Sequence, residues 1–278
     1  MEQPRIGHIN FLNVLPLTYS FANGYSDGLA LTQAVPAELN RRMREHSLDI
    51  SAISSIAYAR NAEDLLLLPD ICIRSEADVE SIVLVSRRPA GELHKERVIL
   101  TAKSETSHCL LKIILEKAYH VMPQYEIRPI GLEDFLPEDA TASLLIGDDA
   151  LHIYCNRRPG LFYYDLGLEW NRLTGHSMVY ALWAVQKSFA KDSPELLRLA
   201  HERITGGLRE GLRRKEEAIC SVLSEKKFSY EVLDHYLGNI IRWDFTEEPM
   251  ESLRLFYRLA QEQGLIQSVP DIRLADIT

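Results

Sequence analysis

The chain has 278 residues, of which 46% are hydrophobic and 26% charged, a composition typical of a soluble protein with enough apolar material for two modest lobes. Its 40 acidic residues outnumber its 31 basic residues and give a formal net charge of −9, so we expect no nucleic-acid partner. The sequence has neither the roughly 20-residue apolar run of a membrane span nor the pattern of a signal peptide, so we expect no membrane association and a cytoplasmic location.

The first part of the chain alternates apolar runs with helical patterns. We predict strands at residues 5–12, 29–35, 48–54 and 65–73. We predict helices at residues 13–22, 36–46 and 56–61, with Pro16 and Pro36 in the first turns of two of them. This order predicts parallel strands that are joined by crossover helices.

A second series of strands and helices follows. The expected strands span residues 81–86, 98–102, 125–130, 143–147, 163–166 and 178–186, and the expected helices span residues 104–119, 148–154 and 169–173. From Ser193 the pattern is helical to about residue 264, with breaks near residues 226–228 and 242–244. Gly206, Gly207 and Gly211 lie inside the first of these helices and predict close packing or a local bend.

The strand-like runs at residues 81–86 and 178–186 are the expected crossings between two lobes. One lobe would comprise residues 1–84 plus 184–278, and the other residues 85–183. A chain that leaves one lobe and returns to it makes two hinge connections, which is the geometry of a closing cleft. We therefore predict an α/β fold with two lobes, mixed sheets flanked by helices, and a cleft lined by strand ends and helix N-termini.

Five strand-to-helix turns carry short polar residues of the kind that bind anions or cap helices. Asn10, which we place within the first strand, is unusual there because a buried amide needs partners. Asp148 could bind a hydroxyl, act as a base or only cap its helix. The substrate-binding candidates are His8, Asn10, Ser54, Ser55, Thr106, Ser107, Gly147, Asp148, Thr174 and Met178.

Strong catalytic fingerprints are missing from the sequence. It contains no dinucleotide-binding glycine pattern, nucleophile elbow, zinc-protease helix motif or P-loop lysine motif. The cysteines form no Cys-x-x-Cys pair, and the histidines do not have metal-ligand spacing. We therefore expect no metal and no cofactor, and the residues alone predict a monomer or homodimer with a cleft for a small anion.

Residues 7–17, Gly-His-Ile-Asn-Phe-Leu-Asn-Val-Leu-Pro-Leu, resemble the N-terminal signature of the chorismate dehydratases of the futalosine route to menaquinone. The likeness continues in order through Leu48-Asp49-Ile50, Leu68-Pro69-Asp70, Leu145-Ile146-Gly147-Asp148, Asp165-Leu166-Gly167 with Trp170, and Thr174-Gly175. The resemblance implies the type II periplasmic-binding-protein fold. It also implies a lyase that removes water from chorismate, a small dianion, to give 3-[(1-carboxyvinyl)oxy]benzoate.

The implied chemistry is compatible with the residues. Hydroxyl-bearing helix starts suit the two carboxylates of chorismate. Loss of the ring proton beside the enolpyruvyl ether, together with the neighbouring hydroxyl, makes the ring aromatic. Because aromatisation drives the reaction, a correctly positioned substrate and modest general acid–base catalysis suffice. Our hypothesis is that the substrate's own enolpyruvyl carboxylate takes the proton, while Asn13 and Ser81 hold substrate and leaving group. Alternatively, Asn13 caps a helix, and the hydroxyl of Ser81 is bonded to the backbone at the end of a strand.

Two other functions fit the same fold. The first is a binding protein or ligand sensor for a small anion that performs no chemistry, because fold alone does not fix function. The second is the related 1,4-dihydroxy-6-naphthoate synthase, which would need a larger cleft and a base such as His8 or His176.

Overall fold

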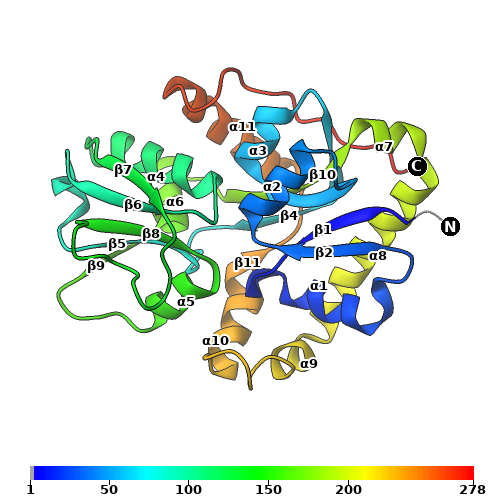
Figure 1. Cartoon of the computed structure of the whole chain (residues 1–278), viewed down its shortest axis with the longest axis horizontal. Coiled ribbons are helices and arrows are strands. Elements are labelled where there is room, and N and C mark those ends of the chain that lie inside the picture. Colours follow the sequence, from blue (N-terminus) through cyan, green and yellow to red (C-terminus); the bar gives the residue numbers. More distant parts are fainter. Residues whose placement is uncertain (1–2) are drawn as a thin grey trace.

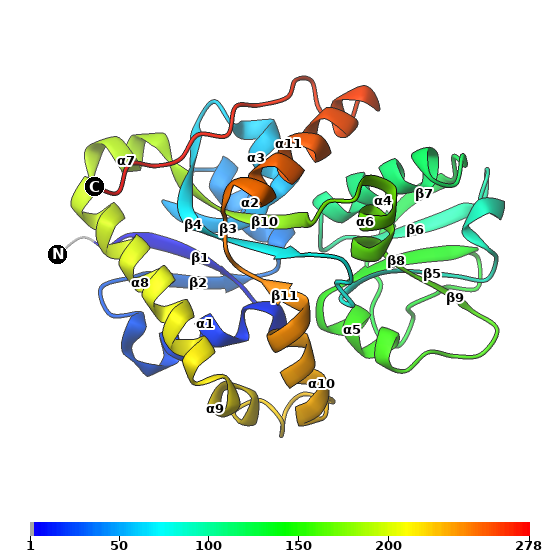
Figure 2. The same cartoon turned by 180° about the vertical axis from the view of Figure 1, so that it is seen from behind.

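The computed structural model describes residues 3–278, and these form two lobes that each contain one β-sheet (Figures 1 and 2). Residues 1 and 2 of the predicted first lobe lie outside the described residues. Helices cover both faces of each sheet, as the two views show. The predicted α/β class with mixed sheets flanked by helices is confirmed, because each sheet contains parallel and antiparallel pairs.

The larger lobe has a six-stranded sheet with the order β11-β4-β10-β3-β1-β2. Its strands are β1 (Arg5–Ile9), β2 (Ala30–Ala34), β3 (Ile50–Ser54), β4 (Leu65–Ser75), β10 (Met178–Gln186) and β11 (Ile241–Arg242). The first three strands pair in parallel, as predicted, whereas β10 runs antiparallel to β3 and β4. Every residue of β10 is buried, so this returning strand lies at the centre of the sheet.

Helices from both ends of the chain cover this sheet. They are α1 (Leu15–Ser20), α2 (Pro36–Arg44), α3 (Ser55–Asn61), α7 (Lys187–Asp192), α8 (Pro194–Arg213), α9 (Lys215–Cys220), α10 (Tyr230–His235) and α11 (Glu247–Glu262). Helices α2, α3 and α11 lie on one face, and α1 and α8 lie on the other (Figures 1 and 2). The predicted close packing of α8 is confirmed, because a Cβ on Gly211 would lie 1.8 Å from the carbonyl oxygen of Pro16.

The smaller lobe has a five-stranded sheet with the order β7-β6-β8-β5-β9. Its elements are β5 (Ile82–Ser86), β6 (Arg97–Thr101), α4 (Thr106–Lys117), β7 (Gln124–Arg128), β8 (Ala142–Ile146), α5 (Gly147–Cys155), β9 (Phe162–Asp165) and α6 (Leu166–Thr174). Alternation along β5 directs Val83 and Val85 into a small core on one face, and Leu84 into the large core on the other. That large core continues into the other lobe.

The chain crosses between the lobes twice, after β4 and before β10. The predicted boundaries at residues 84 and 184 fall inside β5 and β10, yet each of these strands pairs within one sheet only. A strand that pairs wholly within one sheet belongs to that lobe. We therefore propose that the boundaries lie at residues 76–81 and 175–177.

Two predicted elements near the N-terminus differ from the structure. The first strand ends at Ile9, so Asn10 lies beyond it and is exposed rather than buried. The predicted helix 13–22 is a 3₁₀ turn (Leu12–Val14), then α1, then a π-helical turn (Phe21–Tyr25). The helix ends there because Gly24 has φ = +101°. The short helix α7 was not predicted.

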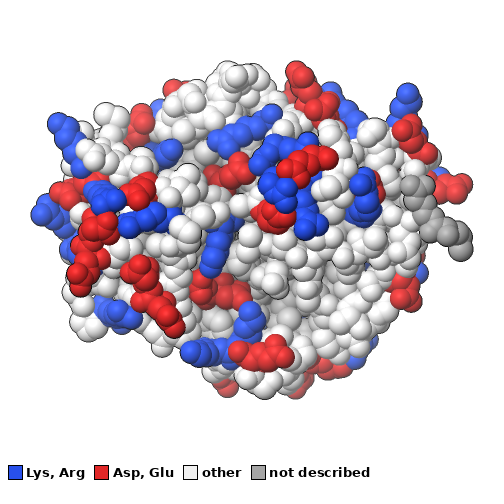
Figure 3. Space-filling model, viewed as in Figure 1, with Lys and Arg blue, Asp and Glu red and all other residues white. Residues whose placement is uncertain are grey.

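Charges are mixed on the surface. On the face shown in Figure 3, acidic and basic side chains are interspersed over both lobes, and the described residues form no continuous basic stripe on that face. None of the helices within residues 3–278 is both long enough and apolar enough to cross a membrane.

Candidate active site

A cavity lies where the two lobes meet, and it encloses about 560 Å³, including the part that is open to solvent. One part of its wall is apolar and consists of Ile9, Phe11, Pro36, Ile73, Val79, Ile82, Ile146, Ala181 and Ile241. The remaining lining residues are Asn13, Ser54, Ser81, Ser104, Thr106, Ser107, Gly147 and Tyr180. No lining residue is charged.

The structure brings several of the predicted site residues to this cavity and places the others elsewhere. The predicted residues that line it are Asn13, Ser54, Ser81, Thr106, Ser107 and Gly147. The predicted residues that do not line it are His8, Asn10, Ser55, Asp148, Thr174 and Met178.

His8 is buried in the larger lobe and is not among the residues that line the cavity. Its Nε2 lies 2.7 Å from Oγ1 of Thr18, and Thr18 donates its own hydrogen to the carbonyl oxygen of Val14. Nε2 is therefore the donor and carries the proton of a neutral ring. Burial lowers the pKa of His8 to about 4, and the ring packs against Phe21 and Trp183. His8 is a structural residue here and does not contact the cavity.

Other predicted residues serve the fold. Ser55 donates to the carbonyl oxygen of Val179, and Thr174 donates to that of Trp170. Met178 is 1% exposed and belongs to the large core. These hydroxyl groups and this thioether are used by local packing, which explains why they are not available to a ligand.

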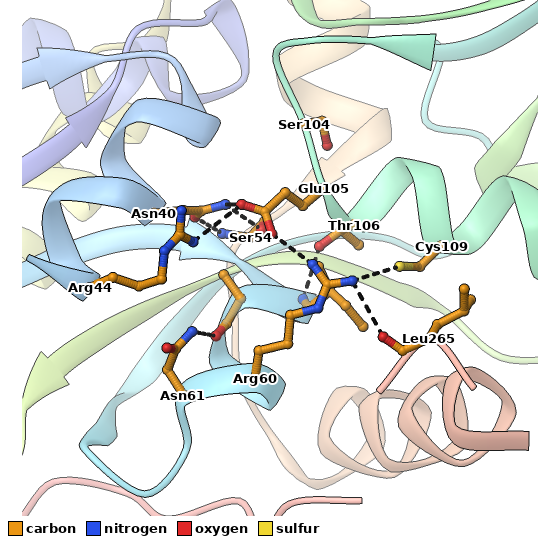
Figure 4. Close-up of polar contacts among 12 residues, drawn as sticks. Asn40, Arg44, Ser54, Arg60, Asn61, Ser104, Glu105, Thr106, Cys109 and Leu265 are labelled. Atoms are coloured by element: carbon orange, nitrogen blue, oxygen red, sulfur yellow. Dashed lines mark hydrogen bonds and ion pairs between the residues drawn. The ribbon is translucent and has the colours of Figure 1, made fainter. Parts of the chain in front are cut away.

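Ser54 stands at the carboxyl end of β3 and is held by Asn40 from α2 (Figure 4). Nδ2 of Asn40 donates to Oγ of Ser54 over 2.8 Å, and the backbone N–H of Ser54 donates to Oδ1 of Asn40 over 3.0 Å. Because Oγ already accepts a hydrogen bond, its own hydrogen is free for an acceptor in the cavity.

A second group of hydroxyls surrounds the start of α4 in the smaller lobe. Oγ1 of Thr106 accepts from the backbone N–H of Ile56 in the larger lobe over 3.1 Å, and so caps α3 from across the cleft. Oγ of Ser104 accepts from the backbone N–H of Ser107 over 3.4 Å. The hydroxyl of Ser107 is buried and has no partner.

Ser81 stands at the first crossing between the lobes. Its Oγ accepts a hydrogen bond of 2.7 Å from the hydroxyl of Tyr236, which is buried in the larger lobe. The backbone around Ser81 is held by Asp165, which accepts from the N–H groups of Val79 and Glu80. Burial raises the pKa of Asp165 to about 6, whereas these hydrogen bonds favour its charged form.

The serine and threonine hydroxyls of the cavity share one property, which is that each is left as a donor. Within residues 3–278, no protein acceptor is found for the hydroxyl hydrogen of Ser54, Ser81, Ser104, Thr106 or Ser107. Buried polar groups are normally satisfied, so this set is suited to a ligand rich in acceptor atoms.

Asn13 supplies a complementary acceptor. Its backbone carbonyl accepts from the indole N–H of Trp243 over 3.0 Å, which fixes the turn between β1 and α1. Its side-chain Oδ1 is buried and has no hydrogen-bond partner. No side-chain cap bond is formed at the adjacent helix start, so the capping alternative for Asn13 does not describe this structure. A ligand hydroxyl would satisfy this oxygen.

Two carboxylates join the lobes on either side of the cavity. In the smaller lobe, Asp148 accepts from the backbone N–H of Leu12 over 2.9 Å and from Nζ of Lys226 over 2.6 Å. Glu105 bonds to Asn40 over 3.0 Å and pairs with Arg44 and Arg60 (Figure 4). Asp148 thus links the lobes.

Sequence reasoning missed two tyrosines of the site. Tyr180 lines the cavity from β10 and shares a hydrogen bond of 2.9 Å with Ser75. Tyr236 donates a hydrogen bond to Ser81 from a segment whose sequence pattern indicates only a helix. No motif signals either residue, because both depend on how distant strands and helices meet. Among residues 3–278, no cluster of three His, Cys, Asp or Glu side chains is arranged to hold a metal ion.

Comparison with known proteins gives a consistent result. A family model described as menaquinone biosynthesis matches residues 4–262. A Thermus thermophilus protein named chorismate dehydratase is 31% identical over 266 residues, which are 90% of this chain and 93% of that protein.

Solved structures resemble the fold at low sequence identity. An alkanesulfonate-binding protein of Xanthomonas axonopodis matches with a TM-score of 0.69 and 15% identity over 98% of this chain and 96% of its own. A Candida albicans protein described as having the generic periplasmic binding protein fold matches with a TM-score of 0.69 and 12% identity over 100% of this chain and 99% of its own. The expected two-lobed fold of that class is thereby confirmed.

Proposed function

The chain belongs to the menaquinone biosynthesis family, and we propose that it is a chorismate dehydratase, a cytoplasmic hydro-lyase that forms 3-[(1-carboxyvinyl)oxy]benzoate. The observation that carries this proposal is the polarity of the cavity, where five hydroxyl donors face an apolar wall and one unpartnered amide oxygen. Chorismate offers the matching set, since it has two carboxylates, an ether oxygen, an apolar ring and a single hydroxyl donor.

The arrangement suggests how the substrate would lie. The carboxylates would accept from the hydroxyls around the start of α4 and from Ser54, which lie on opposite lobes. Hydrogen bonds to ionised acceptors are stronger than neutral ones, so neutral donors can hold a dianion without a cation in the wall. The ring would contact the apolar residues, and its hydroxyl would donate to Oδ1 of Asn13.

The reaction then needs little further help from side chains. The enolpyruvyl carboxylate removes the ring proton, the C–H electrons form the new ring double bond, and the C–O bond to the hydroxyl breaks. The departing hydroxyl takes up the proton that the enolpyruvyl carboxylate has removed and leaves as water, which restores the carboxylate, while Ser81 donates a hydrogen bond to the departing oxygen. Aromatisation drives the step, and the cavity contributes mainly by holding the reacting groups in place.

The alternatives have less support in this cavity. The related naphthoate synthase would use a base such as a histidine, but no histidine lines the cavity in the described part of the chain. His8 is buried and neutral, and His176 lies on the connection between α6 and β10. A binding protein without chemistry would bind the same ligand and leave it unchanged.

The decisive experiment is to incubate the purified protein with chorismate and follow the products by proton NMR and mass spectrometry. Loss of one water with new signals of a meta-substituted benzoate is the expected outcome. Chorismate that binds but persists, beside an active control enzyme, would replace the proposal with the binding-protein alternative.

A further inference from the structure

Tyr236 is placed to control the side chain of Ser81 from outside the cavity. It is 1% exposed and is the first residue of the π-helical turn (Tyr236–Ile240) that follows α10. Its hydroxyl donates to Oγ of Ser81 over 2.7 Å. Turns of this rare type often mark functional positions, because they shift a side chain out of helical register.

The direction of this hydrogen bond decides what Ser81 does. A serine hydroxyl that accepts from a fixed donor directs its own hydrogen elsewhere, and Ser81 lines the cavity on the other side. Burial raises the pKa of Tyr236 well above its usual range, and this effect outweighs the hydrogen bond with Ser81, which lowers the pKa. The phenol is therefore protonated near neutral pH and can act as a donor.

The two lobes hold different parts of Ser81. Asp165, in the smaller lobe, accepts from the N–H groups of Val79 and Glu80 and so fixes the backbone, in which Glu80 has φ = +58°. Tyr236, in the larger lobe, forms its hydrogen bond with the side chain of Ser81 and not with its backbone. The hydroxyl of Ser81 is thus oriented by a contact that exists when the lobes are together.

We propose that Tyr236 is a positioning residue for the dehydration, which holds the hydroxyl hydrogen of Ser81 toward the departing hydroxyl of the substrate. This inference rests on the proposed function, because Tyr236 acts only through Ser81. It assigns to Tyr236 an effect on turnover and not on binding, since the phenol does not line the cavity.

The test compares Tyr236→Phe, Ser81→Ala and the double variant with the wild-type protein in steady-state dehydration of chorismate. Tyr236→Phe keeps the ring and removes only the donor, so we expect kcat to fall about tenfold with KM changed less than twofold. The double variant should be no slower than Ser81→Ala alone, because the two residues act in series. Tyr58→Phe is the matched control, since its buried hydroxyl donates to the carbonyl oxygen of Asp271 away from the cavity, and it should leave both constants unchanged.

Additive effects in the double variant, or a loss of kcat in Tyr58→Phe as large as that in Tyr236→Phe, would overturn the positioning role. A wild-type protein that does not convert chorismate would instead overturn the proposed function and this inference with it.

Discussion

The ring of Phe11 in the larger lobe occupies the space that a side chain on Gly147 in the smaller lobe would need. A Cβ on Gly147 would lie 2.8 Å from the ring carbons Cδ1 and Cε1 of Phe11. The backbone of Gly147 also has φ = +68°, a conformation that residues with a side chain rarely adopt. Glycine at this position therefore allows the lobes to approach closely enough to enclose the cavity.

This contact predicts the effect of Gly147→Ala. The added methyl group would push Phe11 and hold the lobes apart, so we expect the Kd for a non-reactive substrate analogue to rise at least tenfold, measured by calorimetry. Gly160→Ala is the matched control, because Gly160 has φ = +81° but no atom near its missing Cβ. It should lower the free energy of unfolding by about 1 kcal/mol and leave affinity unchanged. Equal affinities for the two variants would contradict the steric argument.

The link made by Asp148 gives a second prediction. Asp148→Ala removes the acceptor for the backbone N–H of Leu12 and for Lys226, so the open arrangement should become more populated. We expect roughly a tenfold loss of affinity for the analogue and a larger radius of gyration in small-angle X-ray scattering.

Lys226→Ala separates the two contacts of Asp148. It removes only a partly exposed ion pair, with side-chain exposures of 39% and 21%, and such pairs contribute little. Affinity should change less than about twofold at physiological salt. A loss as large as that of Asp148→Ala would show that the ion pair, and not the backbone contact, joins the lobes.

The fold was largely predictable, because alternating apolar runs and helix starts are local signals. Parallel pairing of β1 with β2 and β3 followed from the strand–helix order. The exposed position of Asn10 was not predictable, since the strand ends at Ile9 where backbone pairing stops, and the apolar pattern continues beyond it.

The site was predictable only in part. Ser54 and Thr106 lie at strand-to-helix turns, where polar residues face a cleft. Sequence pattern cannot show whether such a hydroxyl is already used, as that of Ser55 is by the carbonyl oxygen of Val179. The contact between Tyr236 and Ser81 joins residues 155 positions apart and has no local signature.

Burial of His8 predicts a specific dependence of stability on pH. Its pKa is about 4 in the folded protein and about 6.5 in the unfolded chain. Between these values the unfolded state binds the extra proton, so stability falls as pH falls. The contribution of His8 to the free energy of unfolding should be about 2 kcal/mol smaller at pH 5 than at pH 7.

The variant His8→Gln isolates this contribution. Glutamine keeps a donor for Thr18 and does not titrate, so the difference in unfolding free energy between wild type and variant should change between pH 5 and pH 7 in urea titrations. A difference that is the same at both values would mean that His8 is not held neutral in the folded protein.

The donor character of the cavity predicts the effect of removing one hydroxyl. Ser107→Ala deletes a buried hydroxyl that has no protein partner, so the free protein should lose no stability, while affinity for a carboxylate-bearing analogue should fall about tenfold. Ser143→Ala is the control, because its buried hydroxyl donates to the carbonyl oxygen of Phe135 away from the cavity. It should lower stability and leave affinity unchanged. The reverse pattern would show that Ser107 serves the fold.

Asn13 and Asn10 provide the sharpest comparison within one segment. Oδ1 of Asn13 is buried without a partner at the cavity, whereas Asn10 is exposed and does not line it. If Asn13 holds the departing hydroxyl, Asn13→Ala should lower kcat by about 100-fold, the size of effect expected for a group that contacts the reacting atoms. Asn10→Ala should stay within twofold of wild type. Because the two residues lie three positions apart in the same turn, a general disturbance of that turn would affect both variants, whereas loss of the contact with substrate affects only Asn13→Ala.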